Sequence, residues 1–453
     1  MKYSKLGALA AGALLVFSAC SGSTATTPPA ASTAASSAPV ASTGASAGTS
    51  TAPASAAAAE PAVCQNKKGS SSSTIDIYSS EPLEGTSLAQ TSTIVSELKT
   101  VLDGQKVGNF TIKFISLDDA SAANKGDWDG TVEQSNATMA VNDPDAMAYI
   151  GTYNSGAAKL SIPILNGACL AMFSPANSYP GLTKAVAGVT TPGEPGSYYP
   201  NTYRNYARDI NTDDVQGGAS SEWAYSLGFK TAYVIDDGQT YGQGIGRAWA
   251  QHFGKIGGKV VSANATTEDY DPSATDYQAL AQKIKASGAD VVFIGAITGQ
   301  GTAKLWKDIR SVNPTIAMFG PDGVNEKSWF TGAGSAAVGT YLTFGGVDVS
   351  QLTGTGKTWA AAYEAANNGT QPPFYAAYGH AAGQIILNAL TQAGTNDRYA
   401  VLQAMMATAN LDTVIGSFTL DPNGDPKGGV ISSYIMGSTW PPTYKGVITQ
   451  AQP

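Results

Sequence analysis

The sequence predicts an α/β fold built from two parallel sheets, each covered by helices on both faces. Short apolar strands alternate with helical segments in two series, the first over residues 74–174 and the second over residues 231–319. The helical segments carry apolar stripes on one side, such as Leu280, Ala281 and Ile284. One-sided stripes of this kind are typical of helices that pack on a sheet.

The predicted elements follow each other in the order strand, helix, strand in both series. In the first series we expect strands at 74–78, 110–117, 146–151 and 170–174, with helices at 86–102, 131–142 and 155–165. In the second we expect strands at 231–236, 259–263, 290–296 and 315–319, with helices at 243–257, 273–288 and 299–312. Parallel strands need a crossover connection, which these helices supply, so two doubly wound sheets are predicted.

The N-terminus is typical of an exported protein. Lys2 and Lys5 precede a twelve-residue apolar stretch that ends at Phe17, and small residues then lead to Cys20. The stretch is too short to span a bilayer core of about 30 Å, so residues 1–19 are predicted to be a signal peptide. Small residues before a cysteine resemble the bacterial lipoprotein cleavage box, which predicts a lipid on Cys20. The alternative is an ordinary signal peptide in which Cys20 has no role.

A tract of low complexity follows the predicted signal. Residues 21–63 are almost entirely Ala, Ser, Thr, Pro and Gly, and Glu60 is their one charged residue. Such a segment cannot bury enough apolar surface to offset its ordering entropy. We therefore predict a flexible tether over residues 20–72, which holds a folded body near a membrane outside the cytoplasm.

Composition and motif spacing exclude several classes of function. With 26 Lys and Arg against 34 Asp and Glu, the net charge is −8, which argues against a nucleic-acid partner. Two His and three Cys are too few for a zinc site rich in these residues, and no metal or cofactor is expected. A phosphate loop at 354–358 would need glycine where Gln351 stands, and a dinucleotide motif at 242–246 would need glycine where Arg247 stands.

The loops after the predicted strands are the candidate ligand site, because open α/β sheets bind ligands beyond the carboxyl ends of their strands. These loops are residues 151–156, 174–181, 237–242, 296–298 and 320–323.

The same loops carry a family resemblance. The runs 149–158, 173–183, 213–217 and 320–324 resemble those of the branched-chain amino acid binding proteins. These are substrate-binding lipoproteins of ABC importers with the type I periplasmic binding fold. The resemblance runs in order over residues 73–447, and it implies two lobes joined by a three-strand hinge. It implies a first lobe of residues 73–209 and 346–426, and a second of residues 210–345 and 427–449.

The resemblance also implies roles for residues of the first lobe. Ser155 matches the serine that holds the ligand carboxylate, and its place at a predicted helix start favours an anion. The alternative for Ser155 is a helix N-cap without a ligand. Ala176 and Ser178 match the positions whose backbone and hydroxyl complete this cradle.

In the second lobe, Tyr241 matches the aromatic residue that closes over the ligand, and Asp322 matches the acid that pairs with the ligand ammonium. The alternative for Asp322 is a Pro-Asp-Gly turn in which it bonds only its own backbone. Thr298 belongs to a loop where family members can offer a tyrosine. No tyrosine stands there, so we expect a less aromatic wall and leave the ligand open between an amino acid and a related amide.

Cys64 and Cys169 remain once Cys20 is assigned to lipid. In an oxidising compartment they can form one disulfide, or they can stay as two buried thiols.

The sequence thus predicts an extracytoplasmic solute-binding lipoprotein rather than an enzyme. Its expected partners are a small zwitterion, an ABC permease and the membrane, and the protein is expected to be a monomer. A ligand sensor of the same fold is one alternative, since sequence hardly separates the two. An exported hydrolase is the other, and the absence of a recognisable triad argues against it.

Overall fold

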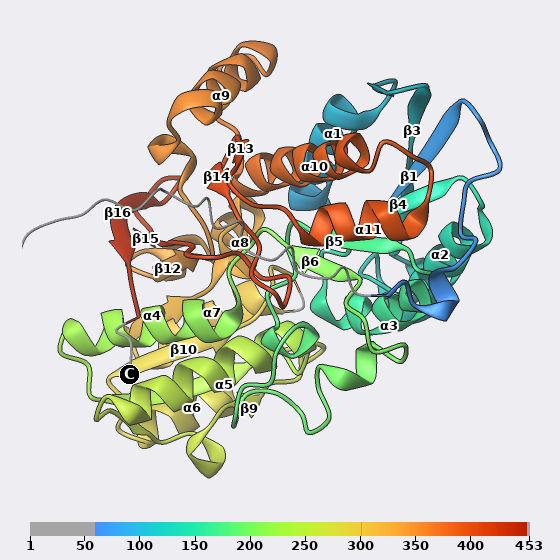
Figure 1. The fold of residues 1–453 in the computed structure, drawn as a ribbon. Helices are drawn as coiled ribbons and strands as arrows, with labels where there is room; N and C mark the ends of the chain where they lie inside the picture. The colour runs from blue at the N-terminus through green and yellow to red at the C-terminus, as the bar shows by residue number, and fades with distance from the viewer. Residues whose placement is uncertain (1–58, 300, 451–453) are drawn as a thin grey trace, which may run out of the picture. The chain divides into compact units, whose positions relative to one another are not determined.

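The protein is described by a computed structural model that covers residues 59–299 and 301–450. The predicted signal peptide, Cys20 and the tether up to residue 58 lie outside these described residues. The predicted α/β class with two sheets is confirmed. We call the part built on the six-stranded sheet the first lobe and the part built on the eight-stranded sheet the second lobe (Figure 1).

The sheet of the first lobe has the order β2-β3-β1-β4-β5-β6, and all neighbours are parallel except β2 and β3. In Figure 1, α1 and α10 cover one face of this sheet and α2 and α3 cover the other. The strands are β1 (Thr74–Glu81), β2 (Lys106–Val107), β3 (Phe110–Asp118), β4 (Ala146–Gly151), β5 (Ala171–Ser174) and β6 (Tyr206–Arg208). The helices are α1 (Leu88–Leu102), α2 (Gly130–Asn142), α3 (Ser155–Asn166), α9 (Gly354–Ala366), α10 (Phe374–Ala393) and α11 (Arg398–Met406). A hairpin of β13 (Leu411–Thr413) and β14 (Gly416–Phe418) lies beside α9.

The sheet of the second lobe has the order β16-β15-β12-β11-β10-β7-β8, and β9 pairs with β7. Its strands are β7 (Thr231–Asp236), β8 (Lys259–Val260), β9 (Glu268–Asp269), β10 (Val291–Gly295), β11 (Ala317–Gly320), β12 (Tyr341–Phe344), β15 (Ile431–Ile435) and β16 (Thr443–Ile448). Its helices are α4 (Asp213–Ser226), α5 (Thr240–Lys255), α6 (Gln278–Ala286), α7 (Thr302–Val312) and α8 (Lys327–Ala333).

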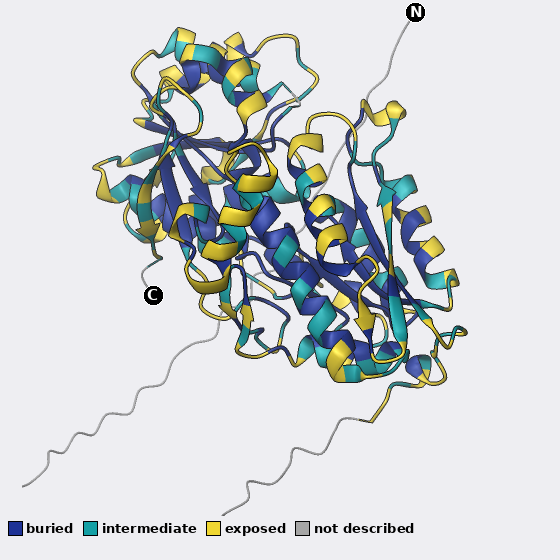
Figure 2. Ribbon diagram, turned by 90° about the horizontal axis from the view of Figure 1, so that it is seen from above, coloured by how far each residue is buried: buried dark blue, intermediate teal, exposed yellow. Residues whose placement is uncertain are grey.

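Helices cover both faces of this second sheet because its central strands are apolar on both sides. Phe293 of β10 stacks on Trp249 of α5 with ring centroids 5.2 Å apart. The next residue, Ile294, belongs to the core cluster that contains Trp306 of α7. Successive side chains of a strand point to opposite faces, so α5 and α7 lie on opposite faces. Figure 2 shows the resulting buried layers through both lobes.

Some predicted boundaries differ from the structure. The helix expected at 273–288 begins at Gln278, because the N–H of Tyr277 donates to the carboxylate of Asp308 at 2.7 Å instead of to a helical carbonyl. β15 and β16 are antiparallel additions to the sheet edge that were not predicted. Because β2 is also antiparallel to β3 in the first lobe, neither sheet is purely parallel.

Three chain segments connect the lobes, and Asn211 joins them. Its backbone N–H and its side-chain Nδ2 donate to the carbonyl of Gly345 at 3.0 and 2.8 Å, and Nδ2 also donates to Val430 at 2.9 Å. A Cβ at Gly429 would lie 2.0 Å from Oδ1 of Asn211, so only glycine fits this close approach. The three crossings are thus tied to one another at a single side chain.

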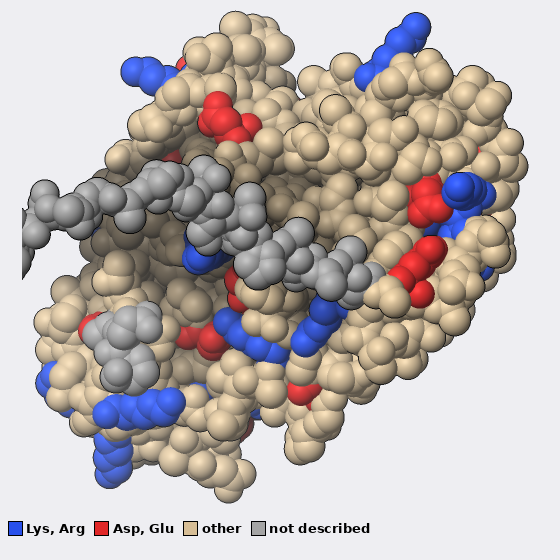
Figure 3. Space-filling view, viewed as in Figure 1, with Lys and Arg blue, Asp and Glu red and all other residues tan. Residues whose placement is uncertain are grey.

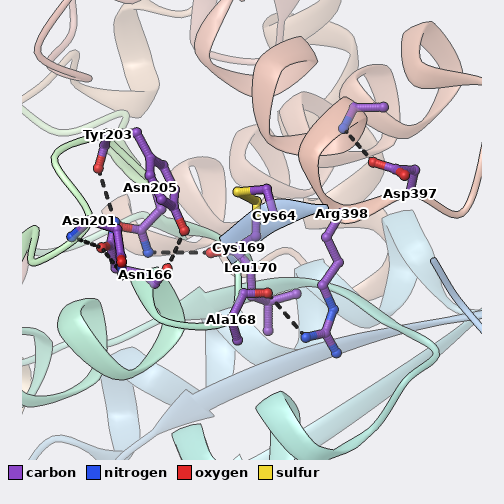
Figure 4. The surroundings of a disulfide bond; sticks show 11 residues. Cys64, Asn166, Ala168, Cys169, Leu170, Asn201, Tyr203, Asn205, Asp397 and Arg398 are labelled. Carbon is purple, nitrogen blue, oxygen red and sulfur yellow. Dashed lines mark hydrogen bonds between the residues drawn. A yellow bond between two sulfur atoms is a disulfide. The ribbon is translucent and has the colours of Figure 1, made fainter. Parts of the chain in front are cut away.

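The start of the described chain is fixed to the first lobe. Cys64 and Cys169 form a disulfide with Cα atoms 5.1 Å apart (Figure 4). The N–H of Gly69 donates to Asn396 at 2.8 Å, and that of Arg398 donates to Lys67 at 3.1 Å. Contacts with the folded body therefore begin at Cys64, within the stretch that was predicted as tether up to residue 72.

Candidate ligand-binding site

A small cavity lies between the loops of the two lobes. Its lining comes from six places in the chain: the β4–α3 loop, the loop after β5, the start of α5, the loop after β10, the turn after β11 and the start of α10. The lining residues are Tyr153, Asn154, Ser155, Ala176, Tyr241, Ile297, Asp322, Gly323 and Tyr375. Four predicted site residues, Ser155, Ala176, Tyr241 and Asp322, are thus brought together, as expected from the carboxyl ends of parallel strands.

Asp322 is the charged residue of this lining, and it is 4% exposed. One carboxylate oxygen, Oδ1, accepts from Nε2 of Gln216 at 2.5 Å and from the hydroxyl of Tyr241 at 3.2 Å. The other oxygen, Oδ2, accepts from the hydroxyl of Tyr375 at 2.6 Å. Burial raises the pKa of Asp322, and the hydrogen bonds from Tyr375 and Gln216 oppose this rise. The predicted turn is present as a short 3-10 helix, Asp322–Val324, but the side chain faces the cavity residues rather than only its own backbone.

A second carboxylate lies close to this site. Asp213, the first residue of α4, is fully buried, and neither of its carboxylate oxygens has a hydrogen-bond partner. Burial raises the pKa of Asp213, the negative charge of Asp322 adds to the rise, and the positive charge of Arg208 opposes it. The site therefore holds two buried acids: neutral donors surround the carboxylate of Asp322, whereas the positive charge of Arg208 acts on Asp213.

The opposite side of the cavity is the start of α3. Ser155 is its first residue, and Oγ of Ser155 accepts from the backbone N–H of Tyr179 at 3.3 Å. Asn154 is the N-cap residue but makes no side-chain cap bond, and its Oδ1 has no partner. The first N–H groups of a helix have no acceptor within the helix, so this end of the cavity favours an anion.

The other residues predicted for the cradle are placed differently. The N–H of Ala176 donates to Oγ of Ser174 at 3.1 Å, so this N–H is already bonded within the loop. Ser178 is buried outside the lining, and its carbonyl accepts from the N–H of Asp213 at 2.8 Å. Ser178 is thus linked to the second acid of the site.

Thr298 also lies outside the lining, and its neighbour Ile297 lines the cavity instead. The N–H and hydroxyl of Thr298 donate to the carbonyl of Gly323 at 2.6 and 3.0 Å. Thr298 therefore braces the turn that carries Asp322.

Three tyrosines line the cavity. Tyr153 and Tyr375 meet edge to face with ring centroids 5.5 Å apart, and the hydroxyl of Tyr153 donates to Gln90 of α1. Tyr241 completes the set from the second lobe. The loop at 295–298 contributes Ile297 and no aromatic ring, and the rings of the lining come from α10, the β4–α3 loop and α5.

Sequence reasoning missed Tyr153, Gln216 and Tyr375. Tyr153 and Gln216 stand inside the runs that carried the family resemblance, so the signal was present but was not assigned. Tyr375 had no such signal, because it follows no strand and its position depends on the packing of α10 against α1.

Two α/β lobes with three crossings and a cavity between them define a two-lobed binding protein. The family model for the periplasmic binding proteins matches residues 39–433, so the chain belongs to this family. The family consists of extracytoplasmic solute-binding proteins that are not enzymes, as the sequence predicted. No helix among the described residues is long and apolar enough to cross a membrane.

Curated relatives agree with this assignment. An amino acid binding protein of Pseudomonas aeruginosa is 27% identical over 303 residues, which are 66% of this chain and 73% of the relative. The Leu/Ile/Val-binding protein homolog 1 of Brucella suis is 28% identical over 263 residues, 56% of this chain. That alignment spans 65% of the Brucella protein, just under two thirds of its length.

Solved structures confirm the fold. A leucine binding protein, LivK, from Thermotoga maritima has a TM-score of 0.72 at 20% identity, over 83% of this chain and 99% of its own. A benzoate complex of a solute-binding protein from R. palustris has a TM-score of 0.68 at 20% identity, over 83% and 97% of the two chains. An isoleucine complex of LivJ from Streptococcus pneumoniae has a TM-score of 0.65 at 18% identity, over 82% and 99%.

Proposed function

We propose that the protein is the solute-binding component of an ABC importer and that it captures an amino acid, or a related small molecule with an ammonium group, between its lobes. The observation that carries this proposal is the environment of Asp322. This buried carboxylate lines the cavity, and the side chains that donate to it are a glutamine amide and two tyrosine hydroxyls, all of them neutral. A buried carboxylate is costly without a cation, and a bound ammonium would offset that cost.

The other end of the cavity supports a ligand carboxylate. The first turn of α3, with Ser155, presents N–H groups and the positive end of the helix dipole. A zwitterion would offer a complementary group to each end: its ammonium toward Asp322 and its carboxylate toward Ser155. The names of the relatives, which include amino acid and Leu/Ile/Val-binding proteins, point to the same class of ligand.

The three crossings support capture by closure of the lobes. We infer that residues 73–209 with 346–426 move against residues 210–345 with 427–449, with the segments around Asn211 as the hinge. Ligand contacts from both lobes exist together only when the lobes meet, so a ligand stabilises the closed state selectively. The closed protein would then deliver its ligand to a permease.

The ligand class is tested with molecules that each lack one charge. A thermal-shift screen of the twenty amino acids and small amides comes first, because binding raises apparent stability. Calorimetry then compares L-leucine with 4-methylpentanoate, which lacks the ammonium, and with 3-methylbutylamine, which lacks the carboxylate. We expect each analogue to bind at least about tenfold more weakly, the equivalent of ~1.4 kcal/mol.

Benzoate is the informative competitor in this experiment, because a structural neighbour is a benzoate complex. Benzoate has a carboxylate and no ammonium. If benzoate or 4-methylpentanoate binds more tightly than every amino acid, the ammonium site is refuted while the two-lobed binding mechanism stands.

We also propose that the protein is an extracytoplasmic monomer, held at the membrane by lipid on Cys20. Support comes from the cleavage box before Cys20 and from the uncharged tract that follows it. Cys20→Ser should release the protein from the membrane fraction and leave its thermal unfolding unchanged. Retention of the serine variant on membranes after a high-salt wash would refute the anchor.

A further inference from the structure

The loop between β3 and α2, residues 119–129, is folded on itself at the edge of the site. Ala120 and Trp128 form an antiparallel bridge, and the N–H of Gly126 donates to the carbonyl of Ser121 at 2.8 Å. The hydroxyl of Ser121 donates to the carboxylate of Asp129 at 2.7 Å. These bonds hold Trp128 in place at the end of the loop.

Trp128 contacts both lobes. Its indole Nε1 donates to Oε1 of Gln239, the residue just before α5 of the second lobe, at 3.0 Å. Its ring covers Gly156 in the first turn of α3, where an added Cβ would lie only 2.7 Å from Cζ2 of the indole. Gly156 follows Ser155, and Gln239 stands two residues before Tyr241. Trp128 therefore joins the first turns of two helices that line the cavity.

The same loop supports a second contact between the lobes. The hydroxyl of Thr86 donates to the carboxylate of Asp127 at 3.3 Å. Gly299 of the second lobe packs directly on Thr86, where an added Cβ would lie 2.4 Å from Oγ1. Gly299 has a φ of +101°, so its backbone conformation also favours glycine. Two first-lobe residues thus contact the second lobe: Trp128 of the loop, and Thr86, which is hydrogen-bonded to Asp127 of the loop.

We propose that Trp128 is a positioning residue that latches the two lobes in their closed arrangement and so governs how long the ligand stays bound. This inference rests on the proposed function. Trp128 is not part of the cavity lining, so it acts through the lobes and not through the ligand. Its bond to Gln239 requires both lobes to be together, and a contact made in one state alone shifts the population toward that state.

The test removes this hydrogen bond from either side. Trp128→Phe keeps a ring over Gly156 but loses the donor, and Gln239→Leu loses the acceptor. Trp359→Phe is the matched control, because the indole of Trp359 donates to Glu97 at 3.0 Å within the first lobe. With L-leucine as the probe, stopped-flow measurements give association and dissociation rates for each protein.

We expect the dissociation rate to rise about 3- to 10-fold in Trp128→Phe and in Gln239→Leu, the range for one hydrogen bond. The association rates of these two variants should stay within about twofold of wild type, and so should both rates of the Trp359→Phe control. The double variant should lose no more than either single variant, because both remove the same bond. The latch is overturned if the single variants dissociate at the wild-type rate. It is also overturned if the free-energy effects of the two substitutions simply add in the double variant.

Failure of the proposed function is recognised separately. If the wild-type protein does not bind L-leucine, the branched-chain ligand is refuted, and small-angle scattering of the protein without ligand decides the latch. A compact wild type and a Trp128→Phe variant with a larger radius of gyration support it. An extended wild type, or a variant as compact as wild type, overturns it.

Discussion

Asp322→Asn separates the ligand role of this carboxylate from any role in the fold. The substitution keeps the size of the side chain and removes its negative charge. In the folded protein the carboxylate accepts from Gln216, Tyr241 and Tyr375, and an amide oxygen can keep at least one of these bonds. Burial raises the pKa of Asp322, so the charge is a cost to the empty protein and its loss offsets the lost bonds. We therefore expect unfolding of the empty protein to change little.

Binding should change much more, because an ammonium would be buried without its counter-charge. Loss of one partner of a buried charge pair costs about 2–5 kcal/mol, which is about 30-fold to 4,000-fold in Kd. Calorimetry with L-leucine measures this loss, and 4-methylpentanoate, which has no ammonium, is the matched ligand that should not suffer it. Unchanged leucine affinity together with a lower unfolding temperature would refute the reasoning and leave Asp322 as a turn residue.

The same pairing fixes the sign of the pH dependence. The raised pKa means that Asp322 of the empty protein takes up a proton at a higher pH than an ordinary aspartate, whose value is 3.8. Leucine needs the ionised form, so its affinity should fall as the pH is lowered through this raised pKa. Asp322→Asn should flatten the profile over that range.

Three further predictions concern other parts of the molecule. Tyr241→Ala should weaken ligand binding by about 1–3 kcal/mol, because it removes apolar contact from the second lobe; equal affinities by calorimetry would exclude Tyr241 from the site. Asp425→Asn should destabilise the fold by about 3–5 kcal/mol by chemical denaturation, because the fully buried guanidinium of Arg208 loses its partner at 2.8 Å. Burial alone would raise the pKa of Asp425, but Arg208 holds this pKa below its usual value. The stability that the ion pair contributes is therefore present at neutral pH and is lost as the pH falls through the lowered pKa. Replacing both Cys64 and Cys169 by Ser should cost about 2–5 kcal/mol of unfolding free energy with no change in affinity; a loss of affinity as large as the loss of stability would show that the bridge also shapes the site.

Charged side chains are sparse on the face of the molecule that Figure 3 shows. Figure 3 shows scattered Lys, Arg, Asp and Glu on one face, without a large patch of either sign. This agrees with a chain in which 13% of residues are charged. Of the two buried acids described at the site, Asp322 lines the cavity and Asp213 lies outside its lining.

Local sequence determined the elements of the fold and their order. Strands such as β4 and β7 begin and end where the apolar runs predicted, because a buried parallel strand must be apolar along its length. The order of strands and helices also predicted which loops meet at the sheet edges. Four of the six predicted ligand residues line the cavity for this reason.

Only the tertiary structure decided how those loops complete one another. The bonds of Tyr375 and Gln216 to Asp322 join residues 53 and 106 positions away from it. The bond between Trp128 and Gln239 spans 111 positions and two lobes. Hydrophobic periodicity reports which face of an element is buried, but it does not report which distant side chain lies across from it. Those pairings depend on how α10, α4 and the 119–129 loop pack in space, and packing is a property of the whole chain.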